Sequence, residues 1–134
     1  MPAIAAAAVA TRPEKWAVDI TVGGHRLVAD EPVAAGGQGE GPSPYGYLLS
    51  GLGACTAITL RMYAERKGWD IGPLRVHLEI QAESEHGGGH IERRIGFGPE
   101  VTKEQRERLL EIAEKTPVTR TIKAGMEIIT TTQA

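Results

Sequence analysis

The feature that most constrains the fold is one uninterrupted helical pattern. Ser43-Pro44 predicts its start, because a serine side chain can cap the first amides and proline suits the first helical position. Apolar side chains then recur at helical spacing as far as Lys67, and Gly68 predicts a left-handed C-terminal cap. About 24 residues at about 1.5 Å each give a helix of about 36 Å. In a chain of 134 residues, such a helix must be the central element.

Strands and shorter helices are predicted on both sides of this helix. Period-two alternation of apolar and polar side chains predicts strands, and Thr102 opens a capping box that predicts a second helix. Thr116-Pro117 repeats the pattern of a cap followed by proline and predicts a third helix. The order predicts an α+β fold with a mostly antiparallel sheet, in a single domain over residues 1–134. The expected strands cover residues 16–22, 25–29, 74–82, 91–97 and 125–132, and the expected helices cover residues 102–115 and begin again at Pro117.

Three further features of the sequence leave alternatives open. The first ten residues are apolar but lack the basic start of a signal peptide, so residues 1–15 are a loose tail or contain a first strand. The glycine-rich residues 35–42 predict a mobile loop, and phosphate binding is less favoured because a P-loop ending is missing. Gly46, Gly51 and Gly53 inside the long helix predict the close approach of another backbone, with a second helix as the favoured neighbour.

The composition excludes several classes of function. Fifteen Lys and Arg against 17 Asp and Glu give a formal charge of −2, and the two halves of the chain differ little, so nucleic acid is a poor candidate for a partner. No run of 18 apolar residues is present to cross a membrane. One cysteine, Cys55, cannot form an intrachain disulfide, and this favours a cytoplasmic protein over a small secreted scaffold.

Few side chains suggest chemistry from the pattern alone. Cys55 lies mid-helix among apolar residues, where a thiol is more often a packing residue than a nucleophile. Arg93 falls in phase with the apolar residues of its strand: a place at the sheet's edge is favoured, and an inward charge with a purpose is the alternative. His86 and His90 flank three glycines, so a solvated turn is favoured and no metal site is expected.

Two segments resemble one known family. The segment GGQGEGPSPYGYLLSGLGACTAITLRMYAERKGW, which contains Cys55, resembles the OsmC/Ohr family of thiol-dependent peroxide reductases, and specifically its OsmC-like branch. The later segment IERRIGFGPEVTKEQRERLLEIAEKTPVTRTI is similar to the second region of the family. The resemblance covers roughly residues 16–130. It implies an intertwined homodimer in which a sheet wraps long central helices.

The resemblance also implies a chemistry in which Cys55 is the peroxidatic cysteine. The resolving cysteine of the family would stand in a Cys-Pro-Val segment, which here reads Thr116-Pro117-Val118, so no intramolecular disulfide can form. An active protein would then need an external dithiol such as lipoamide, or a small-molecule thiol, and no cofactor. The family's glutamate is replaced by Tyr45 or Gly46. Arg26 is the nearest candidate for its arginine, with His25 as the alternative register.

Three functional hypotheses follow from this resemblance. The first is a one-Cys reductase of organic hydroperoxides that acts in oxidative stress defence. The second is a non-catalytic member that binds a small hydrophobic ligand at the dimer interface, and the third is a structural or regulatory dimer with an inert cysteine. The candidate binding residues in the long helix are Tyr45, Tyr47, Met62 and Tyr63. Thr116 and Arg120 would face the site from the third helix, although an exposed Arg120 is favoured over one that serves a charged group.

Overall fold

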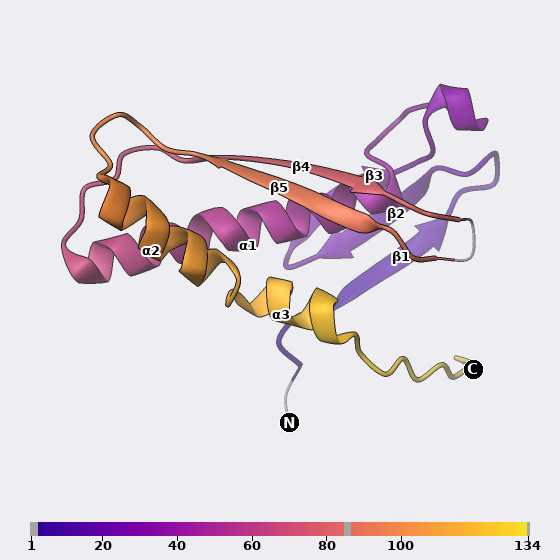
Figure 1. The fold of residues 1–134 in the computed structure, drawn as a ribbon. Helices are drawn as coiled ribbons and strands as arrows, with labels where there is room; N and C mark the ends of the chain where they lie inside the picture. Colours follow the sequence, from indigo (N-terminus) through magenta and orange to yellow (C-terminus); the bar gives the residue numbers. More distant parts are fainter. Residues whose placement is uncertain (1–2, 85–86, 134) are drawn as a thin grey trace. The chain divides into compact units, whose positions relative to one another are not determined.

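The computed structural model describes residues 3–84 and 87–133, and Figure 1 shows their elements. Contacts divide the chain into two compact units, residues 1–48 and residues 49–134, which are described separately. The N-terminal unit contains β1 (Ala7–Thr11), β2 (Val18–Val22), β3 (His25–Ala29), the short 3-10 helix η1 (Val33–Ala35) and the start of α1 (Pro44–Lys67). The C-terminal unit contains the rest of α1, with β4 (Arg75–Gln81), β5 (His90–Gly96), α2 (Lys103–Ala113) and α3 (Pro117–Ala124).

The N-terminal unit is built on a three-stranded antiparallel sheet in the order β1-β2-β3. Gly23 and Gly24 both have positive φ and close the predicted hairpin, in which Val22 pairs with His25. Of the two alternatives for the start of the chain, a strand is present, because Ala7–Thr11 pairs with β2 along its whole length. The hydroxyl of Tyr47 donates to the carbonyl of Val28 at 2.6 Å and ties the first turn of α1 to this sheet.

The glycine-rich loop is ordered around one buried carboxylate, that of Asp30. The backbone amides of Glu31, Gln38 and Glu40 donate to its two oxygens at 2.7, 3.2 and 3.2 Å. Burial alone would raise the pKa of Asp30, but these amide bonds, together with the charge of Arg12, hold it below its ordinary value. The expectation of a mobile loop missed this arrangement. Of the amides considered for phosphate, those of Gln38 and Glu40 bind this carboxylate, and those of Gly36, Gly37 and Gly39 bind backbone carbonyls.

The C-terminal unit is organised around α1, whose bounds agree with the sequence prediction. The antiparallel β4–β5 hairpin and α2 both pack on it. The core comprises Leu60, Ala64, Ile71, Val101, Leu109 and Ala113, with Ile95 and Phe97 packed against it. Gly53 allows a close approach, since a Cβ at this position would lie 2.8 Å from Leu78 Cδ1. The neighbour is a strand side chain and not the second helix that the sequence favoured.

The last elements agree with the sequence up to α3 and depart from it afterwards. Thr102 forms the predicted capping box with Gln105, and Thr116 caps α3 with Pro117 in its first turn. Helix α2 ends at Ala113, two residues earlier than expected, because Thr116 is extended before the proline. The closing strand predicted over residues 125–132 is wrong. Among the described residues no strand pairs with this segment, and an extended chain without a neighbour to accept its hydrogen bonds is not a strand.

In the described part of the chain, no helix is both long and apolar enough to cross a bilayer.

Candidate functional site

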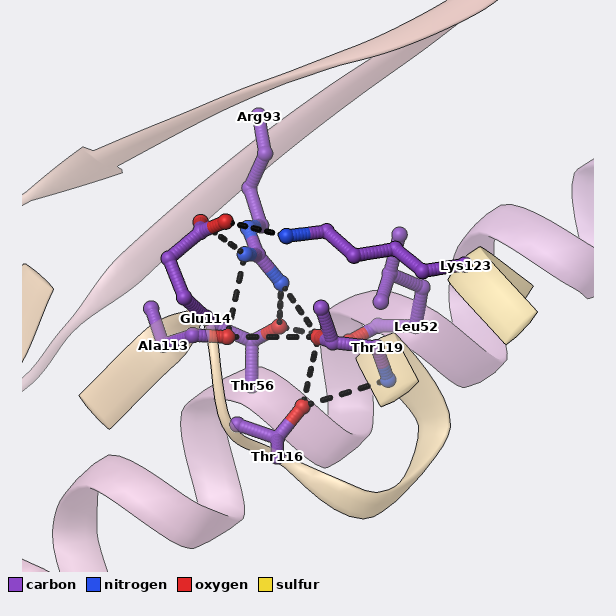
Figure 2. Close-up of polar contacts among 8 residues, drawn as sticks. All are labelled: Leu52, Thr56, Arg93, Ala113, Glu114, Thr116, Thr119 and Lys123. Atoms are coloured by element: carbon purple, nitrogen blue, oxygen red, sulfur yellow. Dashed lines mark hydrogen bonds and ion pairs between the residues drawn. The ribbon is translucent and has the colours of Figure 1, made fainter. Parts of the chain in front are cut away.

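The most elaborate polar arrangement of the C-terminal unit surrounds Arg93, as Figure 2 shows. Arg93 lies on β5 opposite Leu78, and its side chain is only 11% exposed. Its Nη1 donates to the hydroxyl oxygens of Thr56 and Thr119, at 2.9 Å in both bonds. Its Nη2 donates to the carbonyl of Ala113 and to Glu114 Oε2, at 3.0 Å in both bonds. The side chain of Arg93 therefore points inward, as the alternative expected, although β5 is an edge strand of its two-stranded sheet.

A chain of threonine hydroxyls extends this arrangement into the core. Thr119 Oγ1 donates to the carbonyl of Ala113 at 3.2 Å and lies 2.6 Å from Thr116 Oγ1. Because Thr119 has one hydroxyl proton and directs it to Ala113, Thr116 must be the donor between the two hydroxyls. Thr116 Oγ1 also accepts from the backbone amide of Thr119 and caps α3. Thr116, which the resemblance is expected to place at the resolving position, is thus fully buried and caps α3.

The exposed side of the arrangement carries a charged triad of Arg93, Glu114 and Lys123. Lys123 Nζ donates to Glu114 Oε1, and Arg93 binds the other carboxylate oxygen. The hydrogen bond from Lys123 is the largest cause that lowers the pKa of Glu114; partial burial opposes it, and the charge of Arg93 adds to it. We use the name Arg93 cluster for the residues drawn in Figure 2 that contact one another around this guanidinium: Thr56, Arg93, Ala113, Glu114, Thr116, Thr119 and Lys123.

A pocket of about 540 Å³ opens beside the Arg93 cluster. The charged triad and Thr119 supply its main polar side chains, and His90 lies at the same wall. The remaining side chains of the wall are apolar and come from α1, β4, β5 and α3. They are Leu52, Ile80, Ile91 and Ile122.

Cys55 lies on a different side of α1 from its neighbour Thr56. The thiol is partly buried and is not among the residues that line this pocket. Its sulfur lies 3.9 Å from Thr59 Oγ1, one helical turn further along. The same face carries the exposed side chains of Ile58 and Met62, and a Cβ at Gly51 would meet nothing within 4 Å. The cysteine therefore lies on a partly exposed, mostly apolar strip of α1.

The other predicted site residues are dispersed. Arg26 and Tyr45 are exposed side chains of the N-terminal unit, on β3 and in the first turn of α1. In the C-terminal unit, Met62 is 57% exposed on the strip with Cys55, and Arg120 is an exposed residue of α3, as favoured. The hydroxyl of Tyr63 accepts from Arg108 Nε at 2.9 Å and links α1 to α2, which gives this tyrosine a packing role. His86 lies outside the described residues.

Sequence reasoning missed the partners of Arg93. Its phase with the apolar residues of the strand was the available signal, and it indicated an inward side chain. The acceptors could not be read from the sequence, because Thr56 and Thr119 lie 37 residues before and 26 residues after Arg93.

Comparisons with known proteins agree on one family. Residues 37–131 match the OsmC-like protein family. Among solved structures, an OsmC-like protein from Mycoplasma pneumoniae is 17% identical, with a TM-score of 0.77 over 92% of this chain and 89% of that one. An organic hydroperoxide resistance protein from Elizabethkingia anophelis is 18% identical, with a TM-score of 0.73 over 95% and 93%. The organic hydroperoxide resistance protein OhrB of Bacillus subtilis is 20% identical, with a TM-score of 0.62 over 89% and 90%. No sequence among curated proteins matches the chain.

Proposed function

Because the chain belongs to the OsmC-like protein family, we propose that it is a one-Cys thiol peroxidase that reduces organic hydroperoxides at Cys55. In the first step, the Cys55 thiolate attacks one oxygen of the hydroperoxide and the O–O bond breaks. The sulfur becomes a sulfenic acid, and the leaving oxygen takes a proton to become an alcohol. The hydroperoxide is thereby reduced by two electrons that the sulfur supplies.

An external dithiol completes the cycle. One of its thiols attacks the sulfenic sulfur, water leaves, and a mixed disulfide forms. The second thiol of the same molecule attacks that disulfide, which releases the Cys55 thiol and the oxidised dithiol. The need for this reductant follows from the chain itself, because Cys55 is its single cysteine and Thr116 stands at the family's resolving position.

The observation that carries the proposal is the accessibility of this thiol. Cys55 is partly buried and not sealed in the core, whereas the hydroxyl of its neighbour Thr56 is fully enclosed. A hydroperoxide must reach the sulfur, and a packing cysteine is normally among the most buried residues. Thr56 also holds the guanidinium of Arg93 at 2.9 Å, which brings a positive charge to the same turn of α1.

The test is consumption of cumene hydroperoxide with dihydrolipoamide as the reductant. We expect turnover by the unmodified protein and a loss of about 100-fold or more in Cys55→Ser. Thr59→Val is the matched control, since it removes the hydroxyl that contacts the sulfur and keeps the thiol. Dimedone labelling followed by mass spectrometry should detect the sulfenic acid at Cys55. Equal rates in the unmodified protein and Cys55→Ser would reject the activity.

The proposal includes a homodimer in which the exposed side chains of Ile58 and Met62 would contact the second copy, while the Cys55 thiol would have to stay open to the hydroperoxide. Ile58 and Met62 are 59% and 57% exposed, and Gly51 leaves room for a close approach on the same side of the helix. Burial of such apolar side chains against a second copy would be favourable by about 25 cal/mol for each Å² removed from water. Analytical ultracentrifugation should find a dimer that Ile58→Glu converts toward monomer. Glu104→Gln, which changes an exposed side chain on α2, should leave it a dimer.

The proposed biological role and cellular location follow from the same chemistry. A chain that consumes organic hydroperoxides would serve oxidative stress defence, and its need for a reduced thiol suits the cytoplasm. Fractionation of the native host, followed by detection of the chain, checks that location.

A further inference from the structure

The proposed peroxidase chemistry leaves the pocket beside the Arg93 cluster unexplained. Its volume of about 540 Å³ falls within the range of sites for small molecules. It is lined from within the C-terminal unit alone, and none of its lining residues supplies a reacting group in the proposed reaction at Cys55. The arrangement of the wall, apolar on one part and charged on another, determines which class of ligand fits.

The charged part of the wall favours a single negative charge. Arg93 and Lys123 carry two positive charges, and Glu114 compensates one of them. The remaining positive charge matches a carboxylate, whereas a phosphate dianion would bring an excess negative charge next to Glu114. Lys123 is 60% exposed and uses one of its three N–H donors on Glu114, so it can bind a second carboxylate.

The apolar part of the wall favours a hydrocarbon group joined to that carboxylate. Three isoleucines, Ile80, Ile91 and Ile122, and the buried Leu52 provide branched aliphatic surface with no polar atoms in their side chains. Such a surface gains free energy from covering CH₂ groups, at about 0.8 kcal/mol for each one buried. A free inorganic anion or a short polar acid would leave this surface wet.

We propose that this pocket binds a small amphipathic monocarboxylate. Its carboxylate would bind the ammonium group of Lys123 next to the guanidinium of Arg93, and its hydrocarbon chain would lie along Ile80, Ile91 and Ile122. Glu114 and the ligand then share the ammonium group of Lys123, and Arg93 stays fixed by its threonine and backbone partners. The site stands apart from the proposed peroxidase function, because it does not use the thiol.

The experiment uses octanoate as the probe and protein labelled at the isoleucine methyl groups. Titration followed by NMR should give saturable shifts of Ile80, Ile91 and Ile122, with Ile71 in the core unchanged. Lys123→Gln should weaken binding by about fivefold, since its charge is more than half exposed and partly screened. Lys115→Gln, an exposed lysine outside the pocket, should leave the affinity unchanged.

Two ligand controls and one variant distinguish carboxylate binding in this pocket from hydrophobic adsorption elsewhere on the chain. 1-Octanol should bind about tenfold more weakly, and acetate should cause no saturable shift up to about 10 mM. Cys55→Ser should bind octanoate as well as the unmodified protein, whatever its peroxidase rate. The proposal is overturned if octanol binds as tightly as octanoate, if Lys115→Gln weakens binding as much as Lys123→Gln, if the shifts saturate at Ile58 on the α1 strip instead, or if octanoate causes no saturable shift.

Discussion

Thr56 is fully buried and its hydroxyl takes part in two hydrogen bonds, whereas the thiol of its neighbour Cys55 is partly exposed and has one long contact, with Thr59. The two residues share one turn of α1 but belong to different surroundings. Thr56 faces the Arg93 cluster, in which a buried charge has four hydrogen bonds. Cys55 lies on the mostly apolar strip of α1 and is only partly buried.

Within a single turn of α1, Thr56 is therefore expected to support the stability of the fold, and Cys55 is expected to supply the reactive group. A buried guanidinium is tolerated only when its donors are matched, so the Arg93 cluster is expected to be costly to change. A nucleophile needs access and few competing contacts, and its replacement is expected to leave the fold intact. Thr116, which the resemblance aligns with the family's resolving cysteine, follows the first pattern, because its hydroxyl is part of the Arg93 cluster.

The largest effect on stability is expected for Arg93→Met. This change removes four hydrogen bonds and leaves Thr56 and Thr119 with one partner fewer, so we expect a loss of about 2–4 kcal/mol in the free energy of unfolding. Urea denaturation measures it. The matched control is Arg94→Met, because Arg94 is 66% exposed and 3.8 Å from Glu79, and it should cost under about 0.5 kcal/mol. Equal losses of stability in the two variants would contradict the prediction that the hydrogen bonds of Arg93 stabilise the fold.

A smaller loss of stability is expected at Thr116, whose hydroxyl both caps α3 and forms a hydrogen bond with Thr119. Thr116→Val removes the cap of α3 and the hydrogen bond to Thr119, and we expect a loss of about 1–2 kcal/mol. Thr116→Ser keeps the oxygen and should recover most of that loss. Thermal unfolding of the three proteins measures the difference. If serine were as destabilising as valine, the methyl group and not the hydroxyl would be responsible.

Substitutions of the neighbours Thr56 and Cys55 test directly whether one residue supports stability and the other supports peroxide reduction. Thr56→Val keeps the shape of the side chain and removes one acceptor of Arg93, so we expect a loss of about 1 kcal/mol in the free energy of unfolding. Cys55→Ser should change that free energy by less than about 0.5 kcal/mol while it abolishes peroxide reduction. Paired measurements of unfolding and turnover on both variants decide the matter. A large stability loss in Cys55→Ser would mean that the thiol is a packing residue.

Local signals in the sequence were sufficient to predict most of the elements. Ser43-Pro44 and Gly68 bound α1, and Thr102 marks α2, because caps and proline act over a few neighbouring residues. The strand prediction at the C-terminal end failed because strand formation depends on a distant partner. The segment over residues 125–132 has strand composition, but no described strand pairs with it, and composition does not supply a neighbour.

The candidate site was less predictable than the fold for the same reason. Cys55 could be singled out because it is the one thiol in a specific motif, but its partial burial depends on how α1 packs. Arg93 needed acceptors from α1, from the end of α2 and from α3, which only the tertiary structure brings together. Likewise, nothing in the glycine-rich loop itself indicates that Asp30 would bind its amides.

The smallest effect is a dependence of stability on pH at the exposed edge of the Arg93 cluster. The pKa of Glu114 is lower in the folded chain than its ordinary value, chiefly because Lys123 donates to the carboxylate. The unfolded chain therefore binds a proton first as the pH falls, and the stabilisation by Glu114 is complete above pH about 4.5 and is lost below it, through the folded pKa. The carboxylate is more than half exposed, so we expect at most about 0.5–1 kcal/mol. Urea denaturation from pH 3 to pH 7 should show Glu114→Gln less stable than the unmodified protein at neutral pH and equal to it in acid, whereas Glu65→Gln, outside the cluster, should show no such convergence. A constant difference for Glu114→Gln at every pH would mean that its packing, and not its charge, supports the Arg93 cluster.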